Sequence, residues 1–336
     1  MDDRPETFAS GVIATRTAAS SVTLYDFAPI QESFADALLK GLSQPDRSIP
    51  ARFLYDEAGS HLFDRICELP EYYPTRTELS ILRDRATEIA AVIGKCAALV
   101  EFGAGSSQKA RLVLDALDQP VAYVPIDISR QHLIQLAEEI AADHPALQIA
   151  AVCADYTQPL ELPEFSNRAR RVGFFPGSTI GNLPREEARA FLAAWAPQLS
   201  EDGAMIVGVD LKKSVDIVLP AYDDSQGVTA AFSLNVLARA NREAAADFDL
   251  SAFRHHVAYD PASGRVAIHL ESLRDQDVTV AGQRFHFRAG EKIHVEDSNK
   301  YTIEGFQALA REAGYTPEAV WTDPKGLFSV HALRVA

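Results

Sequence analysis

The stretch Ala98-Leu99-Val100-Glu101-Phe102-Gly103-Ala104-Gly105-Ser106-Ser107-Gln108-Lys109 decides the fold. It contains a short apolar run, then a glycine loop, then the start of a helical pattern. This order is typical of the first strand, turn and helix of an α/β sheet that binds a ligand at the carboxyl ends of its strands. Glycines in such a turn let the backbone approach a ligand closely. A single G-x-G pattern also occurs in ordinary turns, so the surrounding sequence matters.

The same alternation continues along the chain. Short apolar runs are separated by stretches with helical spacing, at 108–117, 129–142 and 185–199. The apolar runs lie at 121–126, 148–153, 172–175 and 204–209. Continuous apolar runs of this length predict strands of a parallel sheet that is covered by helices on both faces. We therefore expect an α/β, Rossmann-like domain.

The alternation stops after Asp210. Residues 213–245 have helical spacing, and residues 265–296 have the pattern of a β-meander. A further helix and two strand-like runs follow, at 303–313, 319–321 and 328–333. We predict a domain of residues 77–212 and 300–336 that is interrupted by an insertion. The inserted α+β domain would combine residues 1–76 with residues 213–299, and two domains agree with a length of 336 residues.

Composition excludes several kinds of partner. The formal net charge is −15, which argues against nucleic acid and against anionic membranes, because both are bound mainly through Lys and Arg. No apolar stretch approaches the roughly 20 residues of a membrane span. The start, Met1-Asp2-Asp3-Arg4-Pro5, has no secretory pattern. We expect a cytoplasmic monomer with no nucleic-acid or membrane partner.

We also predict that the protein holds no metal. Cys67, Cys96 and Cys153 are widely spaced and form no C-x-x-C pair. The nine histidines form no H-E-x-x-H motif.

Carboxylates stand at the ends of the next two predicted strands. Asp127 ends the second strand, and Asp155-Tyr156 follows the third. A carboxylate at the first position is suited to ribose hydroxyls, and an acidic–aromatic pair at the next could hold an adenine ring. Position 108 is Gln, so the G-x-G-x-x-G motif is absent, and no P-loop is present. These absences disfavour pyrophosphate ligands and favour S-adenosylmethionine, which carries no phosphate.

A loop of small residues, Phe175-Pro176-Gly177-Ser178-Thr179-Ile180-Gly181-Asn182, follows the fourth predicted strand. Its small side chains would let a small substrate approach closely. The amide of Asn182 could contact that substrate. Alternatively, Asn182 could cap a helix that begins near Pro184.

Several long segments resemble the L-histidine Nα-methyltransferases of ergothioneine biosynthesis, and the resemblance extends from about residue 48 to residue 335. The segments are Phe-Asp-Arg-Ile-Cys-Glu-Leu-Pro-Glu-Tyr-Tyr-Pro-Thr-Arg-Thr-Glu (63–78), Phe-Pro-Gly-Ser-Thr-Ile-Gly-Asn (175–182), Ala-Tyr-Asp-Asp (221–224), Gly-Val-Thr-Ala-Ala-Phe (227–232), Ala-Asp-Phe-Asp-Leu (246–250) and Trp-Thr-Asp-Pro (321–324).

The resemblance implies that S-adenosylmethionine donates three methyl groups to the α-amino group of L-histidine. The product is hercynine, the first intermediate of ergothioneine biosynthesis, and S-adenosylhomocysteine is released. The partners are then L-histidine and its mono- and dimethyl forms. The implied cofactor contacts are Gly103, Lys109, Asp127, Asp155 and Tyr156. The implied histidine contacts are Tyr55, Tyr72, Gly177, Asn182, Tyr222, Glu296 and Ser298.

The resemblance also implies a role for each group of histidine contacts. Glu296 and Ser298 would face the imidazole, and on a strand these two positions share one face. An ionised carboxylate accepts from an imidazole N–H, while a hydroxyl can serve the other ring nitrogen as donor or acceptor. Asn182 and Tyr222 would hold the carboxylate of histidine. The resemblance places Tyr72, the candidate catalytic residue, near the amine. Our own hypothesis is that Tyr72 holds the hydrogens of the amine while water takes the proton.

Two departures keep other functions open. Ile268 stands where some relatives place Met near the imidazole, and the first loop reads Gly-Ala-Gly where Gly-Ser-Gly is common. One alternative is an N-methyltransferase of another small amino acid or amine. The other is a non-catalytic module that senses S-adenosylmethionine.

Overall fold

A computed structural model describes residues 13–16, 22–27, 32–158, 160–163, 169–199 and 202–336. The chain divides into two compact units. Unit 1 comprises Met1–Ile30, Thr77–Leu211 and Tyr301–Ala336, and unit 2 comprises Gln31–Arg76 and Lys212–Lys300. Each unit is described by itself.

Unit 1 is built on a nine-stranded sheet with the order β1-β2-β5-β4-β3-β6-β7-β14-β13. From β2 to β7 the neighbouring strands are parallel, whereas β14 is antiparallel to both β7 and β13. This sheet confirms the predicted α/β, Rossmann-like class. The strands are β1 (Ile13–Arg16), β2 (Val22–Asp26), β3 (Ala97–Phe102), β4 (Ala122–Asp127), β5 (Gln148–Cys153), β6 (Arg170–Phe175), β7 (Ala204–Asp210), β13 (Tyr315–Thr322) and β14 (Phe328–Val335).

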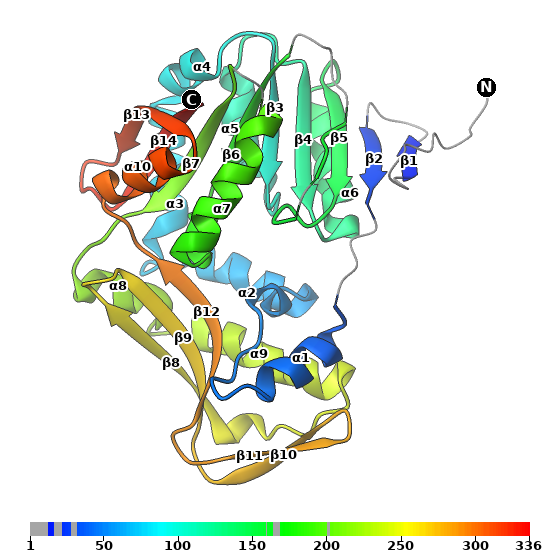
Figure 1. The fold of residues 1–336 in the computed structure, drawn as a ribbon, viewed down its shortest axis with the longest axis vertical. Coiled ribbons are helices and arrows are strands. Elements are labelled where there is room, and N and C mark those ends of the chain that lie inside the picture. The colour runs from blue at the N-terminus through cyan, green and yellow to red at the C-terminus, as the bar shows by residue number, and fades with distance from the viewer. Residues whose placement is uncertain (1–12, 17–21, 28–31, 159, 164–168, 200–201) are drawn as a thin grey trace. The chain divides into compact units, whose positions relative to one another are not determined.

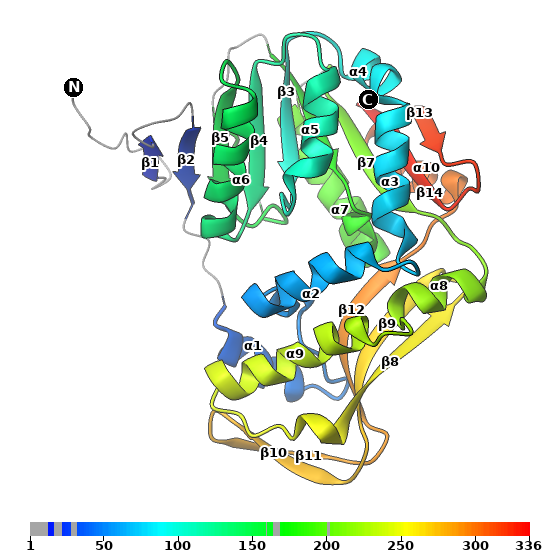
Figure 2. The ribbon, with the colours of Figure 1, turned by 180° about the vertical axis from the view of Figure 1, so that it is seen from behind.

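Helices cover both faces of this sheet (Figures 1 and 2). Leu99 of β3 belongs to one buried apolar cluster, and its neighbour Val100 belongs to the other, because successive side chains of a strand point to opposite faces. The first cluster includes side chains of α3 (Tyr73–Asp84), α4 (Ala86–Ile93), α5 (Ser107–Ala116) and α6 (Arg130–Asp143). The second includes side chains of α7 (Arg185–Trp195), η3 (Ala196–Leu199) and α10 (Ile303–Glu312).

Unit 2 is an α+β unit. A three-stranded antiparallel sheet has the order β12-β9-β8, and β10 and β11 form a separate hairpin. Asp224 holds the start of α9, because its carboxylate accepts from the N–H groups of Val228 and Thr229. The elements are α1 (Phe34–Leu42), η1 (Ala51–Leu54), α2 (Glu57–Glu68), α8 (Val215–Tyr222), α9 (Val228–Glu243), η4 (Leu250–Ala252), β8 (Phe253–Asp260), β9 (Arg265–Ser272), β10 (Gln276–Val280), β11 (Gln283–Phe287) and β12 (Lys292–Asn299).

The beginning of the chain departs from the domain boundaries expected from the sequence. Residues 1–76 were expected to join the inserted domain, but Met1–Ile30 group with unit 1. The physical reason is strand pairing: β2 runs parallel to β5, and Val22 and Leu24 are buried in the apolar core of unit 1. The remaining boundaries of the units lie at 76/77, 211/212 and 300/301.

Two further findings concern the described part of the chain. No helix there is both long enough and apolar enough to cross a membrane. Within the same residues, no three His, Cys, Asp or Glu side chains are grouped so that they could hold a metal ion.

Candidate functional site

The glycine loop after β3 lies at the carboxyl edge of the unit 1 sheet. Gly103 has a φ of +69°, a conformation that side chains disfavour. Its N–H donates to the carbonyl of Ile126 over 3.0 Å, which ties the loop to the end of β4. A Cβ atom added to Gly103 would lie 3.5 Å from the hydroxyl of Tyr156. The backbone of Gly103 and the side chain of Tyr156, both predicted cofactor contacts, therefore lie next to each other.

Asp127 ends β4 beside this loop. Its Oδ1 accepts from the N–H of Ser129 over 2.7 Å, which orients the carboxylate. Burial raises the pKa of Asp127, because the charged form loses water. A half-buried carboxylate at this position is suited to accept hydrogen bonds from ribose hydroxyls.

Asp155 and Tyr156 follow β5, and the N–H of Ala154 ties this strand end to the carbonyl of Asp127 over 3.1 Å. Asp155 accepts from Thr157 through its Oδ1 atom. The ring of Tyr156 packs edge-on against three phenylalanines, at centroid distances of 6.1, 5.9 and 6.0 Å: Phe102, Phe175 and Phe191. The structure thus brings Gly103, Asp127, Asp155 and Tyr156 to one edge of the sheet.

Glu78 connects two of the predicted residues, although the sequence analysis did not select it. Its carboxylate accepts from the N–H of Gly177 over 2.9 Å to each oxygen, and it lies 2.6 Å from Nζ of Lys109. Glu78 is only 1% exposed. Gly177 has a φ of +82°, and a Cβ atom there would lie 3.4 Å from Nζ of Lys109. A buried carboxylate therefore links the loop after β6 to the cation of α5.

Asn182 ends the short helix η2 (Thr179–Asn182) and is half-buried. The helix α7 begins at Arg185, and Pro184 is the residue that precedes it. Asn182 therefore does not cap α7, and that alternative is wrong.

The remaining predicted residues come together in unit 2. The hydroxyls of Tyr222 and Ser298 are 2.9 Å apart, and the rings of Tyr72 and Tyr222 pack edge-on at 6.1 Å. Tyr55 forms a hydrogen bond with Glu296. Five side chains from distant parts of the chain thus form one cluster, which we call the tyrosine–glutamate cluster: Tyr55, Tyr72, Tyr222, Glu296 and Ser298.

β12 positions Glu296 and Ser298. A bulge between His294 and Glu296 shifts the register, so that Glu296 pairs with Ile268 and Ser298 pairs with Val266 of β9. Both side chains are buried, and Glu296 is 9% exposed. Burial raises the pKa of Glu296 to about 7, although the charge of Lys300 and the hydrogen bond from Tyr55 act in the opposite direction.

Lys300 also contacts this cluster, although the sequence analysis did not select it. It is 2% exposed, and its Nζ donates to the hydroxyl of Tyr222 over 2.5 Å and to that of Ser298 over 2.8 Å. A signal was present in the sequence, because Lys300 lies directly beyond the end of β12 and continues the two-residue spacing of Glu296 and Ser298. Lysine is rarely buried, so the residue type alone argues against a buried site residue at position 300.

Tyr72 carries a phenol that stays protonated near neutral pH. Burial raises the pKa of Tyr72 well above its ordinary value, and the neighbouring Tyr222 adds to the effect. Its ring also packs edge-on against Phe63, at 6.3 Å. Tyr72 can hold a ligand through its hydroxyl, but it is not suited to act as a phenolate base.

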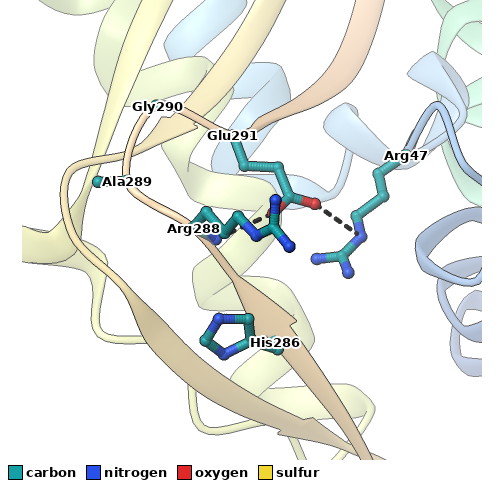
Figure 3. A pocket seen from close by; sticks show the side chains of 6 residues that line it. All are labelled: Arg47, His286, Arg288, Ala289, Gly290 and Glu291. Atoms are coloured by element: carbon teal, nitrogen blue, oxygen red, sulfur yellow. Dashed lines mark hydrogen bonds and ion pairs between the residues drawn. The ribbon is translucent and has the colours of Figure 1, made fainter.

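An open pocket in unit 2 is lined by other residues (Figure 3). Its lining is Arg47, His286, Arg288, Ala289, Gly290 and Glu291, none of which was predicted for the site. Glu291 pairs with Nε of Arg47 at 3.3 Å and accepts from the N–H of Arg288 at 2.9 Å, so its carboxylate is already engaged there. None of the residues that line the pocket belongs to the tyrosine–glutamate cluster.

Comparison with known proteins gives consistent results over most of the chain. Residues 34–335 match the family model described as histidine-specific methyltransferase, SAM-dependent. The chain is 40% identical over 308 residues to histidine N-alpha-methyltransferase of Mycolicibacterium smegmatis, and the aligned region covers 89% of this chain and 95% of that protein. It is 39% identical over 295 residues to the Mycobacterium tuberculosis protein of the same name, which covers 86% and 91%. It is 33% identical over 285 residues to ergothioneine biosynthesis protein 1 of Neurospora crassa, which covers 82% of this chain and 32% of that protein.

Proposed function

We propose that this chain methylates the α-amino group of L-histidine in ergothioneine biosynthesis. The chain belongs to the family of histidine-specific, S-adenosylmethionine-dependent methyltransferases. Three successive transfers give hercynine. Unit 1 binds the methyl donor, and unit 2 binds histidine. The observation that supports histidine most directly is the buried Glu296 with Ser298 on the same strand face, because an imidazole has a ring nitrogen for each of them.

The residues of unit 1 fit S-adenosylmethionine. The positive φ of Gly103 leaves its backbone open to close approach, and Asp127 supplies an acceptor for ribose hydroxyls. The ring of Tyr156 offers an aromatic surface for adenine, and Lys109 offers a cation for the carboxylate of the donor. When bound, the donor supplies a methyl group that is activated by its sulfonium charge and is transferred in line to a neutral amine.

The residues of unit 2 contribute mainly positioning, which can be worth about 7–11 kcal/mol of a reaction barrier. Glu296 and Ser298 hold the imidazole of histidine. The amine must be neutral, because a protonated amine has no lone pair. Burial at the cluster lowers the pKa of the amine, and water takes one proton for each transfer.

Tyr72 holds the hydrogens of the amine through its hydroxyl oxygen. We expect Tyr72→Phe to lower kcat by about 10–100-fold with a small effect on KM, since one hydrogen bond to the reacting group is lost. The variant should also accumulate mono- and dimethylhistidine, which mass spectrometry resolves. Tyr73→Phe is the matched control, because it removes the neighbouring buried phenol, whose oxygen accepts from Lys213. An unchanged rate and product distribution in Tyr72→Phe would remove Tyr72 from the mechanism.

The proposed function is tested with purified protein, S-adenosylmethionine and an equimolar mixture of the twenty free amino acids. We expect histidine alone to gain methyl groups, up to three, as read by mass spectrometry. Methylation of a different amino acid would support the alternative substrate and direct attention to Ile268, which pairs with Glu296. Binding of S-adenosylmethionine without any product would support the sensing module.

A further inference from the structure

We propose that Lys300 determines specificity by making Ser298 a hydrogen-bond donor. Histidine is then bound as the neutral imidazole, with its ring N–H toward Glu296 and its ring lone pair toward Ser298. This inference rests on the proposed function and decides which nitrogen each side chain serves.

The first observation is the close triangle of polar atoms. Nζ of Lys300 lies 2.5 Å from the hydroxyl of Tyr222 and 2.8 Å from that of Ser298, and the two hydroxyls are 2.9 Å apart. Nζ also lies 4.6 Å from the centre of the Tyr222 ring. All three side chains are buried. Burial shields these contacts from water, so the hydrogen-bond pattern inside the triangle is maintained.

The second step is the direction of the hydrogen bonds. An ammonium group has three donors and no acceptor, so the oxygens of Tyr222 and Ser298 must accept from Lys300. The 2.9 Å contact allows either hydroxyl to donate to the other, and we assign the donor to Tyr222, because a phenol is a stronger donor and a weaker acceptor than an alcohol. Both lone pairs of the Ser298 oxygen are then filled. Ser298 can then act toward a ligand only as a donor. The Ser298 hydroxyl, which could otherwise donate or accept, is thereby restricted to donating.

The third step is the charge on the two sides of the ring. Glu296 is an acceptor when it is ionised, and the positive charge of Lys300 favours that form. The site thus offers an acceptor at 296 and a donor beside a cation at 298. A neutral imidazole has one N–H and one lone pair, so it satisfies both. An imidazolium would direct an N–H at the side that holds the ammonium group.

Binding of ring analogues tests this assignment. The two pyrrole isomers of histidine each keep one ring N–H and lack the lone pair at the other nitrogen position. We expect wild-type protein to bind the better isomer about 30-fold or more weakly than histidine, because the hydroxyl of Ser298 is left without an acceptor. The position of the N–H in the better isomer identifies the ring nitrogen that faces Glu296. Isothermal titration calorimetry gives each Kd.

The preference for histidine over the pyrrole analogue should fall at least about tenfold in Lys300→Met and also in Ser298→Ala. The double variant should show no larger fall than the single variants, because Lys300 acts through Ser298. Lys292→Met is the matched control, since Lys292 lies on β12, the strand that ends directly before Lys300, is exposed, and contacts His256. An unchanged preference in Lys300→Met, or additive effects in the double variant, would overturn the proposal.

Nuclear magnetic resonance of wild-type protein gives a test that needs no variant. Histidine labelled with ¹⁵N in the ring should show one protonated and one unprotonated nitrogen when bound. Two protonated nitrogens would overturn the proposal even if Lys300→Met does not fold. Failure of wild-type protein to bind histidine at all is a different result, and it would overturn the proposed function instead.

Discussion

Replacing Glu296 by alanine should lower kcat/KM for L-histidine by roughly 1,000-fold, the largest effect expected in unit 2. The carboxylate is buried, so its removal leaves the imidazole N–H without an acceptor and takes away a negative charge that interacts with the buried Lys300. The Kd of S-adenosylhomocysteine should stay within about twofold of wild type, because Glu296 belongs to unit 2 and the proposed cofactor residues belong to unit 1.

The pH dependence of the Glu296→Gln variant sharpens this prediction. Burial raises the pKa of Glu296 to about 7, so the carboxylate is protonated below that pH and ionised above it. Only the ionised form is purely an acceptor. The ratio of histidine affinities, wild type over Glu296→Gln, should therefore increase as the pH rises from about 6 to about 8. Using the ratio removes the titration of histidine itself, which both proteins share.

Asp297→Asn is the matched control for both Glu296 variants. It removes the neighbouring carboxylate of β12, which pairs with Arg265 and His294. We expect this variant to keep kcat/KM for histidine within a few-fold of wild type. Equal losses in Glu296→Ala and Asp297→Asn would mean that β12 is merely unstable, and would contradict the recognition role of Glu296.

Replacing Glu78 by glutamine should weaken both the stability of unit 1 and its binding of the methyl donor. Glutamine keeps the shape but loses the charge that Lys109 faces and one acceptor for the N–H of Gly177. Hydrogen bonds to charged groups are worth about 1.5–3 kcal/mol each, so we expect a loss of about 2 kcal/mol of unfolding free energy. We also expect the Kd of S-adenosylhomocysteine to rise about tenfold or more, because Lys109 and the loop after β6 are no longer held together.

Thermal unfolding and calorimetric titration of S-adenosylhomocysteine measure the two effects. Glu88→Gln is the control, because Glu88 is a more exposed carboxylate of unit 1 that pairs with Arg85 and accepts from Trp321. Unchanged Tm and Kd in Glu78→Gln would show that Glu78 does not organise the donor site.

Local pattern was enough to predict most of the unit 1 sheet. The apolar runs that form β3 to β7 are buried on both faces of the sheet. They therefore show no alternation of polar and apolar residues and can be recognised as buried strands from the sequence. β2 was not recognised, because it is short and its place beside β5 depends on a pairing between distant residues. The same reason explains why residues 1–30 were expected with the inserted domain.

The sequence by itself determined the α/β class, the glycine loop at Gly103, and the shared strand face of Glu296 and Ser298, because backbone periodicity places such residues within a few positions of one another. Only the tertiary structure decided which charges meet. Glu78 reaches Gly177 across 99 positions, and Lys300 reaches Tyr222 across 78. The physical reason is that a buried charge is tolerated only beside its partner, and the folded chain, rather than any local pattern, brings these partners together.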